Sequence, residues 1–457
     1  MYEHKAYMKT EGDINLTDAR RAWLNDQVDD AVRFILQEDE DVFLHQTLSS
    51  PCLNVLTACE GIYVEDAQGR RIMDFHGNNV HQLGFGHPDV IEAVKQQLDQ
   101  LSFCTRRYTN VPAIELANKL VELTNGSLSR VLFAPGATSA IGMALKLARA
   151  VTGKYKTLSM WGAFHGASLD AISVGGEGAF RRGLGPLLPG AEHVIPFNSY
   201  RCVFGCQDEG HSLCLKPIEY VLEQDGEIGA VVVETIRNTD VQIPPISYYR
   251  RLRELCDKHG ALLIVDETAT GLGRTGTMFA YQHYGIEPDM MVLGKGLGGG
   301  VFPMAALLVK EELNKAQEMS IGHYTHEKSP VGAAAGLAAI RVIEENDLLA
   351  HANVMADLAK QRLKGMMEQY TIIGDIRQIG LLIAVELVTD RVTKEPAVRQ
   401  AEQVMYDCLE HGLNFKVSKG NVLTLSPPLI ITAEQLHAAF DILEASLAKV
   451  EHPLSIS

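Results

Sequence analysis

The sequence lacks the features that mark membrane, secreted and disulfide-rich proteins. Its hydrophobic runs all fall short of the ~20 residues that a membrane-spanning helix requires. The first residues, MYEHKAYMKTEGD, carry no hydrophobic segment of the kind that a secretory signal needs. Eight cysteines among 457 residues are too few for a disulfide framework. We therefore expect a protein of the reducing cytoplasm, with no secretory signal and no membrane partner.

Positive charge is also scarce. The chain has 41 Lys and Arg against 57 Asp and Glu, and the net charge of −16 argues against a nucleic-acid partner or an anionic membrane surface. Hydrophobic residues make up 46% of the chain, which is too many for a disordered protein. At about 150 residues per domain, the length suggests roughly three units, or one large domain and a smaller one. These features predict a globular enzyme with a core large enough to enclose a cleft.

Most of the chain alternates between helical segments and short hydrophobic runs. From about residue 113, the runs VLFAPG, KTLSMW, GAVVVET, ALLIVDE and MMVLGK are brief and apolar, and they end at Gly, Pro or a charged residue. This pattern is typical of buried strands. Strands that alternate with helices indicate a mostly parallel sheet covered on both faces. The predicted fold class is therefore α/β, with a mostly parallel central sheet.

The two ends of the chain depart from this alternation. Residues 13–50 are predicted to be helical, and a strand-turn-strand pattern follows over residues 61–74. After about residue 330, two long helices surround a short set of strands, which indicates a smaller α+β domain. We expect an N-terminal segment over residues 1–70 that contributes to the small domain, a large domain over 71–330 and a C-terminal small domain over 331–457.

Polar residues that follow the predicted strands are the candidates for chemistry, because ligands bind at the carboxyl ends of strands in such sheets. Lys295 lies between glycines after MMVLG, where a lysine can act as a Schiff-base nucleophile, although a solvated loop lysine is the plainer explanation. Asp266 follows ALLIV, where a carboxylate can hold a protonated pyridine nitrogen. A helix N-cap or a salt bridge explains this aspartate equally well.

Two further segments also follow predicted strands. Residues 135–139 (PGATS) lie between VLFA and a predicted helix, where backbone N–H groups and hydroxyls bind a phosphate or simply cap the helix. Residues 164–166 (FHG) follow KTLSMWGA and offer an aromatic face for a planar cofactor, with an ordinary core aromatic as the alternative. No single one of these four features identifies a function.

The order of these four features resembles the class III family of pyridoxal-phosphate-dependent aminotransferases, which have fold type I. The resemblance extends from Gly61 to about Ser426. Its combination of motifs is far more specific than any one of them. It implies a pyridoxal 5′-phosphate cofactor and a large domain joined to a smaller α+β domain. The stretches that carry it are FHGNNVHQLGFGHPDV, FAPGATSAIGMALKLAR, WGAFHGASLDA, IPPISYYRRLRELCDKHGALLIVDETATGLGRTG, PDMMVLGKGLGGG, IRQIGLLIAVELV and NVLTLSPPLIIT.

The resemblance implies roles for particular residues around the cofactor ring. Lys295 forms the Schiff base with the cofactor and later moves a proton at the substrate carbon. Asp266 pairs with the pyridine nitrogen, Phe164 stacks on the ring and His165 lies beside it. Lys295 and Asp266 are therefore the predicted catalytic residues.

The resemblance also implies contacts to the rest of the cofactor. Ala137 and Thr138 cradle the phosphate, while Glu234 and Thr268 belong to the cofactor-binding set. Thr325 matches a threonine that reaches the phosphate from the neighbouring subunit. A phosphate site shared in this way implies a homodimer with two active sites at its interface.

The sequence departs from the family pattern at positions that concern the substrate. Arg237 stands where the family has a glutamine in its Glu-x-x-Gln-Gly segment, and Ala269 replaces the glutamine that helps to hold the ring oxygen. Thr424 stands where many of the transaminases have an arginine that clamps the α-carboxylate of the keto acid. Without that arginine, the keto-acid half-reaction has lost an anchor, unless Lys416 or another cation replaces it.

A family member that needs no keto acid can instead expel a leaving group next to the amine-bearing carbon. The products are then an aldehyde and ammonia, and the family includes lyases of this kind that act on phospho- and phosphono-ethanolamines. The favoured prediction is an ammonia-lyase for a small hydroxy-amino phosphonate. An ω-amine:keto-acid aminotransferase is the main alternative, and a non-catalytic homodimeric scaffold is a remote one. The candidate cations for the phosphonate, each of which is otherwise an ordinary surface residue, are Arg237, Arg106, Arg107 and Lys416.

The roles of two other groups of residues are left undecided by the sequence. The segment YRCVFGCQDEGHSLC places Cys202, Cys206, His211 and Cys214 within thirteen residues, a set that can hold zinc. The spacing is not that of a standard zinc finger, and cysteines are often buried as small apolar side chains, so no metal is predicted. Several polar residues before position 88 are expected to line the cleft mouth, although a structural hydrogen bond is the commoner explanation for each of them: His76, Asn78, Asn79, His81 and His87.

Overall fold

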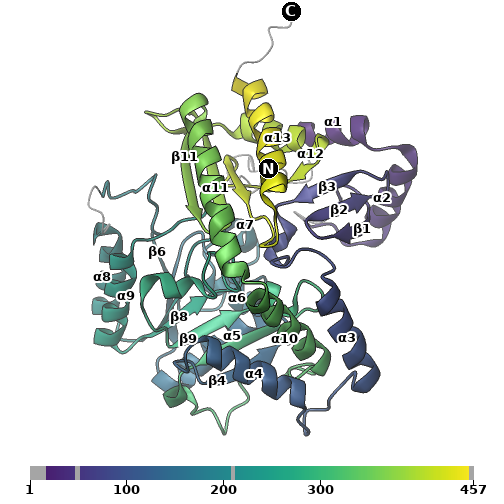
Figure 1. Cartoon of the computed structure of the whole chain (residues 1–457). Helices are drawn as coiled ribbons and strands as arrows, with labels where there is room; N and C mark the ends of the chain where they lie inside the picture. Colours follow the sequence, from purple (N-terminus) through teal and green to yellow (C-terminus); the bar gives the residue numbers. More distant parts are fainter. Residues whose placement is uncertain (1–16, 47–51, 207–211, 452–457) are drawn as a thin grey trace, which may run out of the picture.

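A seven-stranded sheet lies at the centre of the lower part of the molecule in the view of Figure 1. In spatial order its strands are β4 (Arg130–Ala134), β10 (Ala305–Val309), β9 (Met290–Leu293), β8 (Leu262–Asp266), β7 (Ile228–Glu234), β5 (Lys156–Met160) and β6 (Ala191–Val194). The structure is a computed structural model that describes residues 17–46, 52–206 and 212–451. The five strands from β6 to β9 pair in parallel, while β10 is antiparallel to both of its neighbours. The predicted α/β class with a mostly parallel sheet is confirmed.

Alternate residues of each central strand face opposite sides of this sheet, because side chains along a strand alternate in direction. Ala230 and Val232 of β7 belong to the hydrophobic cluster that contains the buried face of α5 (Ala137–Thr152). Val231 and Val233 belong to the cluster on the other face, with α9 (Ile246–His259). Burial on both faces explains why these strands are hydrophobic throughout.

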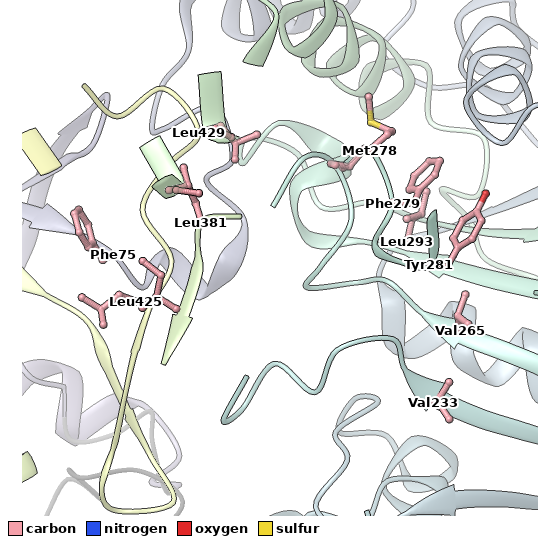
Figure 2. Close-up of a cluster of buried hydrophobic side chains, with 14 of the residues drawn as sticks. Phe75, Val233, Val265, Met278, Phe279, Tyr281, Leu293, Leu381, Leu425 and Leu429 are labelled. Atoms are coloured by element: carbon pink, nitrogen blue, oxygen red, sulfur yellow. The ribbon is translucent and has the colours of Figure 1, made fainter. Parts of the chain in front are cut away.

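The larger hydrophobic cluster continues from the seven-stranded sheet into the smaller sheets (Figure 2). On the strands of the large sheet it contains Val233, Val265 and Leu293, with Met278, Phe279 and Tyr281 beside them; toward the smaller sheets it contains Phe75, Leu381, Leu425 and Leu429. One core thus joins the strands of the large sheet to the elements that face their carboxyl ends. Burying each of these side chains contributes about 1.5–3 kcal/mol.

Two smaller sheets lie above the carboxyl ends of the parallel strands in this view (Figure 1). One contains β11 (Ile373–Ile379), β12 (Leu382–Asp390), β16 (Val422–Leu425), β15 (Lys416–Ser418) and, beside β12, β13 (Glu395–Pro396). The other contains β1 (Leu56–Glu60), β2 (Tyr63–Asp66), β3 (Arg71–Asp74) and β14 (Leu413–Asn414). Strand β14 pairs in parallel with β3, so a late segment completes a sheet that begins near the N-terminus. The predicted domain limits at residues 70 and 330 stay predictions.

The predicted helical run over residues 13–50 contains two helices in its described part, α1 (Asp18–Gln27) and α2 (Asp30–Val42). Val28 is extended, and Asp29 caps α2 by accepting a hydrogen bond from the Val32 N–H at 2.9 Å. The other α-helices are α3 (Pro88–Gln100), α4 (Val111–Leu123), α6 (Leu169–Val174), α7 (Gly178–Arg181), α8 (Lys216–Gln224), α10 (Pro330–Glu345), α11 (Leu348–Gln369), α12 (Val398–Glu410) and α13 (Ala433–Glu451). Among the described residues, no helix combines the length and apolarity needed to cross a membrane.

Candidate active site

A cavity of about 390 Å³ opens at the carboxyl ends of the parallel strands, between the large sheet and the β15 segment. Ligands bind at this edge in open α/β sheets. Eight of the residues predicted to hold the cofactor line the cavity: Ala137, Thr138, Phe164, His165, Glu234, Asp266, Thr268 and Lys295. They come from five separate segments, and the sheet brings them together. Their individual roles stay predictions.

Lys295 lies directly after β9, in a short 3₁₀ turn over Lys295–Gly298. Its φ of +45° lies in the left-handed region, which side chains other than glycine rarely adopt. Burial, and then the positive charge of Lys416, lower its pKa to about 8. A lysine with a lowered pKa is more often neutral at physiological pH, and the neutral amine is the nucleophile.

The glycines on both sides of Lys295 permit a close approach. A Cβ at Gly294 would lie 2.9 Å from the Cβ of Ala137, and a Cβ at Gly296 would lie 2.0 Å from the Gln82 Oε1. The lysine turn is therefore packed directly against the beginning of α5. This packing fixes the distance between the lysine and the predicted phosphate site.

Asp266 and His165 form a buried hydrogen-bonded pair. Asp266 Oδ2 lies 2.8 Å from His165 Nδ1, and Asp266 Oδ1 accepts a hydrogen bond from the Thr268 N–H at 3.0 Å. Although burial opposes both shifts, the hydrogen bond between them raises the pKa of His165 and lowers that of Asp266. The pair therefore keeps a carboxylate charge in the cavity wall, which is the group that a protonated ring nitrogen needs.

Glu234, at the end of β7, holds two loops of the cavity wall. Its Oε1 accepts a hydrogen bond from the Phe164 N–H at 3.0 Å, and its Oε2 accepts one from the Asn238 N–H at 3.0 Å. Burial raises the pKa of this carboxyl. Glu234 thus fixes the backbone that presents Phe164, whose ring also contacts Phe180 at a centroid distance of 4.6 Å.

The N-terminus of α5 faces the cavity through Ala137 and Thr138. The first N–H groups of a helix have no partner within the helix, and the N-cap residue Gly136 has no side chain to satisfy them. Such a terminus attracts phosphate. Gly166 lets the next loop approach, because a Cβ there would lie 2.3 Å from the Thr138 Oγ1 and its φ is +122°.

These residues fit pyridoxal phosphate by their chemistry. The cavity offers a lysine for an aldehyde, a carboxylate for a ring nitrogen and a helix N-terminus for a phosphate. His165 Nε2 is buried and has no hydrogen-bond partner within the described structure, as expected where a bound group supplies one.

The four predicted substrate cations occupy very different positions. Lys416 lines the cavity, whereas the Arg237 guanidinium forms an ion pair with Asp240, with its Nε 2.6 Å from the Asp240 Oδ1. Arg106 and Arg107 are exposed and lie outside the residues that line the cavity. The sequence analysis missed the partner of Arg237, although the Arg-x-x-Asp spacing was the available signal.

Among the positively charged residues, Lys416 lowers the pKa of Lys295 the most. It lies on β15 directly opposite Thr424 of β16, the position where the family's arginine is expected. The buried Thr424 hydroxyl donates to the Thr239 carbonyl at 3.2 Å. Burial, with the charges of Lys416 and Lys295, also lowers the pKa of His76 to about 3, so this cavity-lining imidazole is neutral.

The structure also gives the positions of other residues that the sequence predicted to be in or near the site. His76, Asn78 and Asn79 line the cavity as expected, whereas His81 is bound to the Asp74 carbonyl at 3.0 Å. Thr325 is exposed and does not line the cavity of its own chain. Further lining residues were not predicted from the sequence. Two belong to α7 and its N-cap, and two follow Arg237 in the loop after β7: Glu177, Phe180, Asn238 and Thr239.

The comparison with known families assigns nearly the whole chain. The sequence profile of the family described as Aminotransferase class-III matches residues 46–447. The (R)-1-hydroxy-2-aminoethylphosphonate ammonia-lyase of Vibrio splendidus (strain 12B01) is 51% identical, over 97% of this chain and 96% of that protein. The leucine/methionine racemase of Thermococcus litoralis is 36% identical, over 85% of this chain and 89% of that protein.

Solved structures agree with this assignment. The omega transaminase from Pseudomonas jessenii in complex with PMP superposes with a TM-score of 0.86 at 29% identity, over 91% of this chain and 98% of that one. A PLP-bound amine transaminase from an uncultivated Pseudomonas species gives a TM-score of 0.84 at 30% identity, over 90% and 99%. The cofactor is accordingly pyridoxal phosphate, and the fold prediction of the sequence analysis is confirmed. With a profile match over most of its length and a cavity suited to that cofactor, the chain belongs to the class III aminotransferase family.

Proposed function

We propose that this protein is a pyridoxal-phosphate-dependent ammonia-lyase that converts (R)-1-hydroxy-2-aminoethylphosphonate to phosphonoacetaldehyde and ammonia. The observation that carries this proposal is the 51% identity, over nearly the full length of both chains, to the Vibrio splendidus ammonia-lyase. We further propose that the protein takes part in phosphonate catabolism and that it does so in the cytoplasm.

The distribution of positive charge in the site supports this reaction over a transamination. Thr424 replaces the arginine of the keto-acid clamp, and its hydroxyl is held by a backbone carbonyl. Lys416, directly across the sheet from it, presents a point charge at the cavity wall instead. A lysine binds phosphate-like dianions as a point charge, so Lys416 can serve a phosphonate although the guanidinium of the carboxylate clamp is missing.

The roles of the protein groups follow from their positions. When bound, pyridoxal phosphate supplies an electron sink for the carbon that bears the amine. Lys295 would remove the proton from that carbon, and Asp266, held by His165, would supply the negative charge that a protonated ring nitrogen needs. Loss of hydroxide from the neighbouring carbon leaves an enamine, which takes up water and releases ammonia and the aldehyde. One water molecule is lost in the elimination and one is taken up in the hydrolysis, so the reaction needs no keto acid or other second organic substrate.

The experiment that tests this proposal assays ammonia without any keto acid. The holoenzyme is mixed with an excess of (R)-1-hydroxy-2-aminoethylphosphonate, and many equivalents of ammonia and aldehyde are expected per active site. Lys295→Ala should release none above background. A transaminase would release no ammonia and at most one equivalent of aldehyde per active site, because the amino group stays on the cofactor. Turnover that requires added pyruvate would establish the ω-amine:keto-acid aminotransferase instead.

A second measurement concerns the phosphonate contact. Lys416→Gln removes one charged hydrogen bond, which is worth about 1.5–3 kcal/mol, so kcat/KM for the phosphonate should fall about 10- to 150-fold. An uncharged amine of similar size should be affected much less. Lys449→Gln, which removes an exposed lysine on α13, is the matched control. An equal loss for both substrates would place Lys416 in chemistry rather than in substrate recognition.

We also propose that the enzyme acts as a homodimer. The resemblance assigns Thr325 to the phosphate of the neighbouring subunit, and the exposure of this threonine on its own chain is compatible with such a contact. The exposed Arg106 and Arg107 lie near it, since Arg106 Nε is 3.3 Å from Glu327 Oε1.

A further inference from the structure

Three cysteines converge in the loop between β6 and α8, outside the residues that line the cofactor cavity. The Cys214 Sγ lies 3.5 Å from the Cys202 Sγ and 3.6 Å from the Cys206 Sγ, and all three sulfurs lie within 4.8 Å of one another. No disulfide joins any of the eight cysteines, all of which belong to the described residues. His211, the fourth member of the set in the sequence, lies outside the described residues.

These distances suit three ligands of one metal ion. Zinc binds cysteine sulfur at about 2.3 Å in a tetrahedron, whose edges are then about 3.8 Å long. A disulfide requires about 2.05 Å between its sulfurs, far shorter than either separation here. A chance contact between buried thiols brings two sulfurs together, whereas here each of the three sulfurs lies within 4.8 Å of the other two.

A tight backbone turn brings Cys202 and Cys206 close together, and the thiolate is the form of cysteine that binds metals. Gly205 has a φ of +63°, and its N–H donates to the Cys202 carbonyl at 3.1 Å, which closes a tight turn from Cys202 to Cys206.

The surroundings of Cys214 indicate what a cation would contribute. Cys214 is buried, and its Sγ has the Cys202 and Cys206 sulfurs at 3.5 Å and 3.6 Å. Negative charge on three adjacent sulfurs is therefore unfavourable without a positive charge among them. A divalent cation removes this conflict, and its binding displaces the thiol protons.

We propose that Cys202, Cys206 and Cys214 bind a structural zinc ion. Sulfur ligands select zinc over magnesium and calcium, which prefer oxygen. Structural zinc sites have four ligands, so three thiolates leave one position for a further ligand. None of the three cysteines lines the cofactor cavity, and the ion therefore has no direct part in the proposed reaction.

The position of the loop explains what the ion would stabilise. Arg201 Nε donates to Glu386 Oε1 of β12 at 2.6 Å, and Lys394 Nζ donates to the Tyr200 carbonyl at 2.7 Å. The Ser199 N–H donates to Gln242 Oε1 at 3.1 Å. The residues just before Cys202 therefore connect the five-stranded sheet to the loop after β7. A metal at the end of this segment would hold both connections in place.

The direct test is the metal content of the holoenzyme, purified under reducing conditions from cells grown with added zinc and measured by mass spectrometry of the elements. About one zinc ion per chain is expected in the wild-type protein. The double variant Cys202→Ser/Cys214→Ser should retain less than about a tenth of it. Cys59→Ser, which changes an exposed cysteine of β1, is the matched control and should retain all of it. Wild-type protein without zinc, or a double variant that keeps its zinc, would overturn the proposal.

A measurement on the wild-type protein avoids variants that fold poorly. Titration of the holoenzyme with an organomercurial should release zinc, detected by a metal-binding dye, in proportion to the thiols that react. Chelation should then lower the thermal midpoint, whereas the absorbance of the bound cofactor should persist below that midpoint. Absence of zinc release, or a disulfide between Cys202 and Cys214 in protein kept under reductant, would reject the site. Because neither readout measures turnover, the result is independent of the proposed function.

Discussion

Lys295 is a nucleophile only in its neutral form, and its surroundings lower its pKa to about 8. Burial is the larger cause, and the charge of Lys416 is the next. A positive neighbour disfavours protonation of the amine, so the neutral fraction at pH 7 is larger than for an ordinary lysine. The same lysine that we assign to the phosphonate therefore also affects the reactivity of the catalytic amine.

Lys416→Met should raise the pKa of Lys295, because it removes the positive charge while an uncharged side chain of similar length fills the same space. The rate at which pyridoxal phosphate recombines with the apoenzyme should rise with pH through a midpoint of about 8 in the wild type. In the variant the midpoint should move to higher pH, because the protonated amine is no longer disfavoured by the second charge. Stopped-flow absorbance at a series of pH values measures this. An unmoved midpoint would assign the lowered pKa to burial alone.

Arg237 was predicted to bind substrate, yet the structure gives it a buried partner. The ion pair with Asp240 is enclosed, with side-chain exposures of 11% for Arg237 and 6% for Asp240. Removing one member of a buried pair leaves the other charge uncompensated and costs about 3–5 kcal/mol. A loss of stability, rather than a selective loss of phosphonate turnover, is therefore expected from a change at this position.

A double-mutant cycle distinguishes the two possibilities. Arg237→Gln and Asp240→Asn should each lower the thermal midpoint of the holoenzyme, and the double variant should regain much of the loss, because neither charge then remains buried alone. The midpoint and kcat/KM are measured for all four proteins. If Arg237→Gln keeps the midpoint but loses more than about tenfold in kcat/KM for the phosphonate, Arg237 binds substrate as the sequence suggested.

The difference between Lys295 and Arg237 shows which residues a sequence can locate. Lys295 and Asp266 follow short apolar runs, so the pattern itself places them at a sheet edge. The environment of Arg237 depends on distant segments. Arg377 Nε of β11 donates to the Asp240 carbonyl at 3.0 Å, and Thr424 holds the carbonyl of the preceding residue. No local pattern contains those contacts.

The lysine turn and α5 act together as one unit of the site. A methyl group at Gly294 would lie 2.9 Å from the Ala137 Cβ and 3.2 Å from the Thr268 Cγ2. Both of these neighbours line the cavity, and neither is the end of a long flexible side chain. Extra volume must therefore separate the lysine from the predicted phosphate site.

Gly294→Ala should weaken cofactor binding by about 1–3 kcal/mol, the usual cost of overpacking. The dissociation constant of pyridoxal phosphate, measured by fluorescence titration of the apoenzyme, reports the effect. Adding Ala137→Gly to this variant removes the methyl group that the new side chain would clash with. The double variant should therefore recover part of the affinity for pyridoxal phosphate. Gly226→Ala adds a methyl group where nothing lies within 4 Å and should change little. Unchanged affinity in Gly294→Ala would show that the two elements are not coupled.

At the level of elements, strands that form continuous apolar runs could be predicted, whereas a strand of two residues could not. The run GAVVVE predicted β7 because every residue of it is apolar and buried up to the final carboxylate. Strand β14 has two residues, and its partner β3 lies more than 300 positions earlier in the chain. A pairing of that kind is determined by the packing of whole sheets, and no local periodicity records it.

For the whole molecule, the arrangement of the sheets explains why the site is where it is. The parallel strands end at the cavity, and β15 of the five-stranded sheet closes its other side with Lys416. The large sheet thus supplies the groups assigned to the cofactor, while the smaller part supplies the charge assigned to the substrate. Substrate specificity can change in such a molecule without any change in the cofactor residues.

A shared active site makes a prediction that concerns the assembly as a whole. If Thr325 donates to the phosphate bound by the partner, Thr325→Val removes one hydrogen bond to a charged group, about 1.5–3 kcal/mol. The dissociation constant of pyridoxal phosphate should then rise about 10- to 150-fold. Thr389→Val, on the exposed end of β12, is the matched control and should leave this constant unchanged.

Dilution of the wild-type protein tests the same contact without a mutation. Cofactor binding and dimerisation are linked, so each stabilises the other by mass action. Cofactor affinity should therefore fall once the protein concentration drops below the dimer dissociation constant, and added cofactor should shift sedimenting species from monomer to dimer. Thr325→Val should weaken this dependence because it removes the contact through which the subunits share the phosphate. A monomer that binds pyridoxal phosphate as tightly as the dimer would refute the shared site, although the cavity within each chain would still hold the cofactor.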